Sequence, residues 1–241
     1  MGTLFQFRGI GMLGPIYYLI EYLQVPLPQL LTRNLREIEP STAISLTAAL
    51  VAGHYLPTFA NFLVPKVEDR RWWNAVWQIF PLTVPLIQLP LSILGKRCAK
   101  PTHPKSRERD TKDRMRGIRI AYRSMAVISA LTFLYARRSA PPDASLASIF
   151  WPGLKGHLLP VQSFTEGIAR FLQYDQVLSM ASGFIWLGLR FRELKACGAS
   201  FSWWKTISAL VGTTCAFGPG TAFVVGWGWK EEMLNEMPVS N

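Results

Sequence analysis

Charged residues are missing from three long stretches of this 241-residue chain, residues 42–64, 72–95 and 206–229. Only 17% of the residues are charged and 49% are hydrophobic, whereas about 25% are charged in a typical soluble domain. A helix needs about 20 apolar residues to cross a bilayer. Three runs of this length disfavour a soluble globular fold and predict a polytopic membrane protein.

Several chemical signatures are also missing. The three cysteines, Cys98, Cys197 and Cys215, have neither the spacing of a metal site nor that of a disulfide framework. The chain contains no glycine-rich phosphate loop and no nucleophile elbow, so we predict no metal and no cofactor. It also lacks an Asp-rich motif for binding diphosphate, which disfavours the ionisation of a prenyl diphosphate.

Three weaker segments complete the predicted set of six membrane helices. Residues 9–27 are apolar except for Glu21, and residues 173–189 carry only Asp175. Residues 118–136 carry two arginines near one end, where long side chains reach the interface. A seventh, short or re-entrant helix at residues 146–159 is an alternative, although prolines 152 and 160 disfavour a regular span. The predicted fold class is therefore all-α, a transmembrane helical bundle forming one domain over residues 1–241.

Basic residues concentrate between the third and fourth predicted helices. The chain has a net charge of +11, and residues 96–119 hold ten of its 26 basic residues. A basic loop between two spans marks the cytosolic side, which disfavours a nucleic-acid partner. We therefore predict a multi-pass protein of the endoplasmic reticulum with the loop at 96–119 in the cytosol and both termini in the lumen.

Polar side chains recur at helical spacing in four of the predicted helices. Because exposing them to hydrocarbon is costly, the polar faces should converge inside the bundle. Hydrogen bonds between helices are the alternative role for Thr58, Ser179 and Ser182. The four faces are Gly14, Tyr17, Tyr18, Glu21 and Gln24; His54, Thr58 and Asn61; Asn74, Trp77, Gln78 and Gln88; and Asp175, Ser179, Ser182 and Trp186.

Two acids, Glu21 and Asp175, lie within predicted spans, and both are candidate catalytic residues. A carboxylate at bilayer depth costs about 2.5–3.5 kcal/mol on insertion scales, so it indicates a functional site. The alternatives are a solvated acid at a helix end for Asp175 and a structural partner of His54 or of a buried arginine for Glu21. The candidate substrate-binding residues are Tyr17, Tyr18, His54, Asn61, Trp77, Gln78, Tyr174 and Trp186.

Buried acids among aromatic rings suit one kind of chemistry. Burial disfavours the charged form of a carboxyl group, so a buried acid can serve as a proton donor. Aromatic faces stabilise cations. Together these groups suit a lipophilic substrate that is protonated at an epoxide or alkene and passes through a cation-like state.

Three stretches of the chain carry a family resemblance: FRGIGMLGPIYYLIEYLQVP, RRWWNAVWQIFPL and FLQYDQVLSMASGFIWL. In this order they resemble small fungal integral-membrane cyclases, typified by the terpene cyclase of the ascofuranone pathway. The resemblance implies acid-triggered epoxide opening, followed by ring closure or water capture, in fungal secondary metabolism. It also implies that Asp175, in the QYD stretch, is the acid, and that other pathway enzymes share the membrane.

Three functions stay open at this point. The first is a membrane-embedded cyclase acting on a prenylated or polyketide intermediate. The second is an epoxide hydrolase or isomerase acting on a polyketide or sterol-like substrate. The third is a carrier of the metabolite without enzymatic activity, which the absence of an internal repeat disfavours. All three share a lipophilic small molecule and the lipid bilayer as partners.

The predicted orientation can be tested at Lys105, within the basic segment. A protease site inserted there should be cut from outside in sealed microsomes, because basic loops stay in the cytosol. Protection of that site would reverse the predicted topology.

Overall fold

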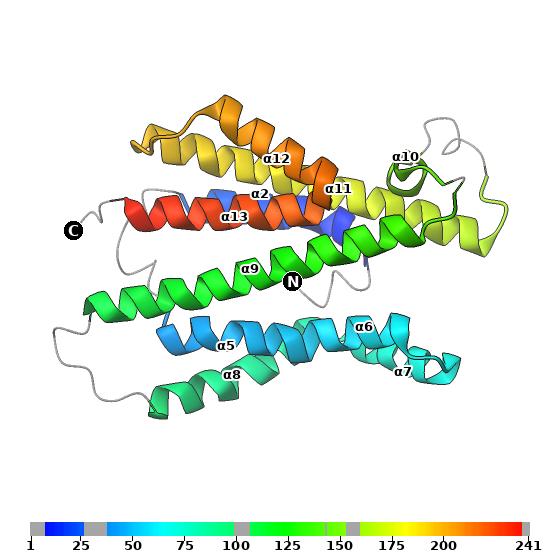
Figure 1. Ribbon diagram of the computed structural model, residues 1–241, viewed down its shortest axis with the longest axis horizontal. Helices are drawn as coiled ribbons and strands as arrows, with labels where there is room; N and C mark the ends of the chain where they lie inside the picture. Colours follow the sequence, from blue (N-terminus) through cyan, green and yellow to red (C-terminus); the bar gives the residue numbers. More distant parts are fainter. Residues whose placement is uncertain (1–7, 27–37, 99–106, 143, 153–159, 238–241) are drawn as a thin grey trace. The chain divides into compact units, whose positions relative to one another are not determined.

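In a computed structural model of the chain, every regular element of the described residues is helical (Figure 1). The structure describes residues 8–26, 38–98, 107–142, 144–152 and 160–237. The all-α prediction is therefore confirmed. The elements are α2 (Ile10–Gln24), α5 (Pro40–Leu50), the π-helical turn η1 (Val51–Tyr55), α6 (Leu56–Leu63), α7 (Val67–Gln78), α8 (Phe80–Cys98), α9 (Arg107–Ser139), α10 (Leu146–Phe150), α11 (Phe164–Ala196), α12 (Trp203–Phe217) and α13 (Pro219–Glu236).

The contacts divide the chain into two compact units, which are described separately. Unit 1 contains Thr3–Leu35 and Met125–Asn241, and unit 2 contains Arg36–Ser124. The division falls within α9. A single domain over residues 1–241 stays a prediction.

In unit 1, helices α2 and α11 pack side by side in parallel, and glycines allow the close approach. A Cβ atom on Gly11 would lie 2.6 Å from the backbone of Asp175, and one on Gly14 would lie 4.0 Å from Ser179. Small residues at such spacing let two helix backbones approach closely. Residue numbers rise together along both helices, which defines the seam as parallel.

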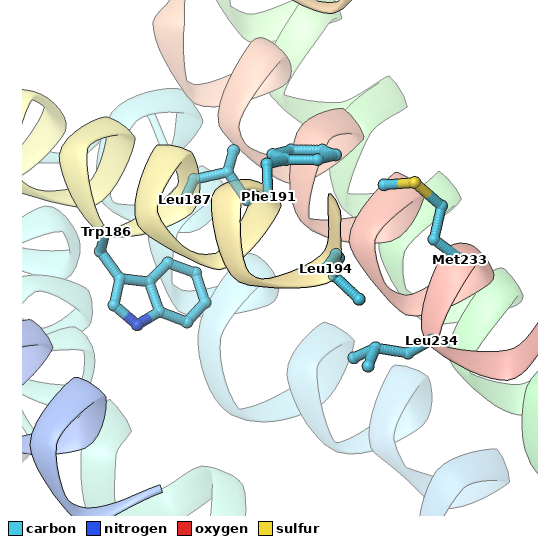
Figure 2. Close-up of a cluster of buried hydrophobic side chains, with 6 residues drawn as sticks. All are labelled: Trp186, Leu187, Phe191, Leu194, Met233 and Leu234. Atoms are coloured by element: carbon cyan, nitrogen blue, oxygen red, sulfur yellow. The ribbon is translucent and has the colours of Figure 1, made fainter. Parts of the chain in front are cut away.

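The core of unit 1 lies between α11 and α13. Figure 2 shows Leu194 of α11 beside Leu234 of α13, and it shows Trp186 on the opposite side of α11 from Phe191. Both leucines are at most 5% exposed. The full cluster is Trp186, Leu187, Phe191, Leu194, Met233 and Leu234.

Residues 206–229, predicted as one span, form parts of two helices instead. Gly218 has φ 88° and ψ 160°, so the chain leaves the α-helical region there, and Pro219 begins α13. A Cβ atom on Gly218 would also lie 2.6 Å from the ring of Phe133, so no larger residue fits. The two helices then pack against each other, and the apolar run folds back on itself.

In unit 2, Pro57 explains the π-helical turn that joins α5 to α6. Proline has no N–H and clashes with the carbonyl four residues earlier, which here belongs to Gly53. The chain widens, so that the N–H of Leu56 donates to the carbonyl of Val51. The hydroxyl of Thr83 donates to the freed Gly53 carbonyl at 3.0 Å.

Two helical segments of the described residues are long and apolar enough to cross a membrane, Pro40–Leu63 and Lys112–Ser139. A third would be the pair Val67–Gln78 and Phe80–Cys98, which is bent by 68°. Pro81 explains the bend, since it removes the hydrogen bond that would continue α7. Each of the six predicted segments falls on helix, but by length and composition the structure supports two or three spans.

Two predicted segments lie partly outside the described residues. Lys105 is one such residue, while residues 107–119 of the predicted basic loop form the start of α9. Of residues 146–159, the structure describes only the five-residue helix α10 and the two residues after it. The cytosolic position of residues 96–119 stays a prediction.

The α2–α11 seam predicts a sharp effect of Gly11→Ala. The added methyl group would overlap the backbone of Asp175, and overpacking of this kind typically costs about 1–3 kcal/mol. The thermal midpoint in detergent should therefore fall.

Gly188→Ala on α11 is the matched control, because a Cβ atom there would meet nothing within 4 Å. It should leave the midpoint unchanged or raise it, since alanine favours a helix. Equal midpoints for the two variants would contradict the seam.

Candidate functional site

The candidate site follows the α2–α11 seam, and Asp175 lies at one end of it. Asp175 lies in the interior of α11, eleven residues after the helix begins at Phe164. Its Oδ1 accepts a hydrogen bond from the backbone N–H of Gly11 at 2.6 Å. Within the described residues, no basic side chain forms an ion pair with it. The half-buried carboxyl group is therefore held by one neutral donor, and it is not at a helix end.

Glu21 lies farther along the same seam and is engaged by a buried cation. Its carboxylate accepts hydrogen bonds from the indole N–H of Trp186 and from the guanidinium of Arg190, the latter at 2.8 Å. Arg190 is 0% exposed and also pairs with Glu193 at 3.0 Å. It donates to the carbonyl of Val25 at 2.8 Å as well. This is the structural role that the sequence left open for Glu21, as the partner of a buried arginine.

The ring of Trp186 is surrounded by aromatic and cationic groups. Tyr18 lies 5.4 Å from it between ring centroids. The guanidinium of Arg190 and the ammonium of Lys230 lie 5.9 and 5.4 Å from the ring centre. Lys230, which is 6% exposed, pairs with its neighbour Glu231 at 2.6 Å. The contacts of Trp186 are therefore those of an anchor among three helices.

The structure does not bring the two predicted catalytic acids together. Glu21 lies ten residues after Gly11, the partner of Asp175, and a helix rises 1.5 Å per residue, so their positions differ by roughly 15 Å along the seam. The two polar faces do meet as predicted, at Gly14 against Ser179 and at Glu21 against Trp186. A catalytic role for either acid stays a prediction. The two carboxyl groups do not form one compact pair.

A cavity of about 570 Å³ lies on the other face of α11. Successive residues of a helix are about 100° apart, so Val177 and Met180 point away from the side that carries Asp175, and Gln176 points to the flank of that side. The rings of Phe133 and Phe150 stack at 5.8 Å beside it. It is lined by Phe133, Phe150, Trp151, Gln176, Val177, Met180, Ala181, Thr214, Cys215 and Pro219. Neither predicted acid is among these residues.

The other predicted substrate-binding residues of unit 1 belong to the two helices of the seam, α2 and α11. Tyr17 is 44% exposed, and its ring meets that of Tyr18 edge-on at 5.7 Å. Tyr174 is half-buried and precedes Asp175. Of the predicted set, Tyr17, Tyr18, Tyr174 and Trp186 therefore belong to unit 1.

The remaining four predicted residues belong to unit 2. The rings of His54 and Trp77 both lie against Phe80, with centroids 4.5 and 6.2 Å away. Asn61 is half-buried and Gln78 is exposed. One pocket that contains all the predicted residues therefore stays a prediction.

Sequence patterns did not identify Arg190 as part of the seam, or Lys230 as a neighbour of Trp186. Arg190 lies four residues after Trp186 and continues the polar face of Asp175, Ser179 and Trp186. That spacing was the signal that could have found it. In the described residues, no group of three or more His, Cys, Asp or Glu side chains could hold a metal ion.

Comparison with known proteins gives one family and several relatives. The CtvD domain matches residues 1–235. The chain is 26% identical to the FAD-dependent monooxygenase verC1 of Penicillium polonicum over 95% of its length, and 27% identical to anuJ of Penicillium roqueforti over 94%. It is 24% identical to BOA8 of Botryotinia fuckeliana, again over 94%. Like verC1, anuJ and BOA8 are named FAD-dependent monooxygenases.

The shares of those relatives that are covered are small. The chain spans 28% of verC1, 27% of anuJ and 28% of BOA8, little more than a quarter of each. No solved structure matches the chain significantly.

The ion pair predicts that Glu21→Gln mainly lowers stability. Glutamine keeps an oxygen that accepts from Trp186, but it removes one of the two carboxylates that pair with the buried guanidinium of Arg190. Breaking a buried pair costs about 3–5 kcal/mol, and Glu193 should keep the loss near the lower value.

The matched control is Glu166→Gln, which weakens an ion pair with Arg170 four residues later on α11. Glu166 is 39% exposed, so its loss should cost less than about 1 kcal/mol. Chemical unfolding in detergent measures both. A Glu21→Gln protein of normal stability and lost turnover would instead make Glu21 a catalytic residue.

Proposed function

We propose that this chain, which belongs to the CtvD-domain family, is a membrane-embedded cyclase of fungal secondary metabolism. It opens an epoxide of a lipophilic prenylated or polyketide intermediate and promotes ring formation. Two or three candidate spans support a membrane location, and the endoplasmic reticulum is the membrane that we propose.

The names of the relatives raise the question of where FAD would bind. FAD-binding folds hold the pyrophosphate at a strand, a glycine-rich turn and the following helix. The described residues form helices only, and the sequence has no such glycine-rich turn, so this chain does not fit FAD. We therefore assign the monooxygenase activity of the relatives to the part of their length that this chain does not span.

Since this chain matches only about a quarter of each relative, we propose that the two parts of the relatives perform different reactions. A monooxygenase that adds an oxygen atom across an alkene produces an epoxide. An epoxide needs no further oxidation to rearrange, only a proton donor and a nucleophile. One observation carries the proposal. The family segment itself has no flavin-binding element, yet it is similar to about a quarter of longer proteins that are named FAD-dependent monooxygenases.

Within this proposal, Asp175 is the proton donor. It has no cationic partner among the described residues, whereas Glu21 is engaged by Arg190. Asp175 would protonate the epoxide oxygen while the carbon–oxygen bond breaks. An oxygen or alkene carbon of the same molecule then bonds to the electron-poor carbon, and the proton it or a neighbouring carbon loses restores the acid.

The aromatic residues share this task unequally. Tyr174 adjoins Asp175 and is the proposed stabiliser of the cation-like state. Trp186 lies eleven residues farther along α11, about 16 Å, and already meets two cations. We therefore give Trp186 a structural role instead of the predicted substrate contact.

Asp175→Asn tests the proposed reaction most directly. Asparagine can still accept the hydrogen bond from Gly11, so the seam should keep its stability, but it cannot donate the same proton. Removing a positioned acid typically costs about 10²–10⁴ in rate. Microsomes containing the variant, incubated with candidate epoxy-prenyl and epoxy-polyketide compounds, should form almost no cyclic product.

Two further variants make this result specific. Asp175→Glu should retain part of the activity. Asp69→Asn, which changes an acid in the first turn of α7, should leave turnover unchanged. Turnover by Asp175→Asn equal to the unchanged protein would remove Asp175 from the reaction.

A further inference from the structure

Two aromatic side chains among the described residues of unit 2 carry a buried nitrogen atom that the proposed reaction does not use. Nδ1 of His54 and Nε1 of Trp77 are shielded from solvent, and neither has a hydrogen-bond partner among the described residues. Buried polar side-chain atoms without partners are rare in native proteins, and each one calls for an explanation. An indole N–H can only donate, so the missing partner of Trp77 is an acceptor.

The two nitrogen atoms belong to rings that share one neighbour. The ring of Phe80 lies 4.5 Å from that of His54 and 6.2 Å from that of Trp77, between centroids. Tyr55 adds a fourth ring, 5.3 Å from His54. The surroundings are therefore aromatic, with polar nitrogen atoms from two separate helical segments.

Both segments are irregular at this point. His54 lies in the π-helical turn η1, next to the Gly53 carbonyl that Pro57 releases. Trp77 lies at the end of α7, immediately before the 68° bend. π-helical turns are frequent at functional sites, and interrupted membrane helices often form binding sites. Phe80 thus marks the place where two backbone irregularities meet.

We propose that His54 and Trp77 form a second binding site for a neutral lipophilic molecule that carries an acceptor oxygen beside a flat ring. The oxygen accepts from the indole N–H, and the imidazole supplies the second polar contact. The flat ring packs on the aromatic side chains, which favour offset or edge contacts. The site belongs to unit 2 and does not depend on the reaction assigned to Asp175.

The indole N–H signals of the protein, labelled with ¹⁵N in detergent micelles, test this site. The signal of Trp77 is the one that disappears in Trp77→Phe. The probe is 2-acetylnaphthalene, and 2-ethylnaphthalene is its matched control without the carbonyl. We expect a saturable downfield shift of the Trp77 signal with the ketone and none with the hydrocarbon. Trp72, exposed on the same helix, should show no such shift.

A variant of the second residue sharpens the result. His54→Phe keeps an aromatic ring and removes the polar contact, so it should weaken ketone binding about tenfold. Trp72→Phe should bind the ketone as the unchanged protein does. The Asp175→Asn protein should also titrate normally, so that failure of this site and failure of the proposed reaction are separate results.

Three outcomes would overturn the second site. One is a Trp77 signal that no carbonyl probe moves, which would mean that water is its partner. Another is an equal shift of the Trp72 and Trp77 signals, which would indicate partition into the micelle. The third is an equal response to the ketone and the hydrocarbon, which would remove the acceptor oxygen from the recognition.

Discussion

The guanidinium of Arg190 imposes the constraint on which unit 1 depends. A fully buried charge is tolerated only when it is paired and hydrogen-bonded. Arg190 meets this need through Glu21 on α2, through the carbonyl of Val25 just after α2, and through Glu193 on its own helix. The pairing fixes how far α2 can slide along α11. At the other end of the seam, glycine at position 11 lets the two backbones meet.

This register gives Glu21 and Asp175 different environments. Glu21 is neutralised by a cation and accepts from Trp186, whereas Asp175 receives one backbone N–H. The acids therefore form no catalytic dyad, and a reaction at Asp175 would take place without Glu21. The cavity beside Met180 opens on the far face of α11, so a molecule inside it would not meet Asp175. The seam, rather than the cavity, carries the proposed chemistry.

Sequence patterns predicted which helix faces would be polar, because polar groups cannot face hydrocarbon. They could not predict the partner of Glu21, since that choice depends on the register of two helices far apart in the chain. The break at Gly218 was signalled by the Gly-Pro-Gly stretch but was hidden by an uninterrupted apolar run. Residues 107–119 were predicted as loop from their charge, although Arg, Lys and Glu are good helix formers. Pro57 and Pro81 disturb the helices in a way that the sequence alone can indicate, since the effect of a proline on a helix is local.

The parallel register of α2 and α11 determines where both acids lie, and a disulfide measures this register directly. A Cβ atom on Gly14 would lie 4.0 Å from that of Ser179, within the range of about 3.5–4.5 Å that a disulfide needs. In a chain with its native cysteines replaced by serine, Gly14→Cys with Ser179→Cys should cross-link on mild oxidation. Glu21→Cys with Asp175→Cys should not, because these positions differ by roughly 15 Å along the seam. A cross-link in the second pair and none in the first would contradict the register and unite the two acids in one site.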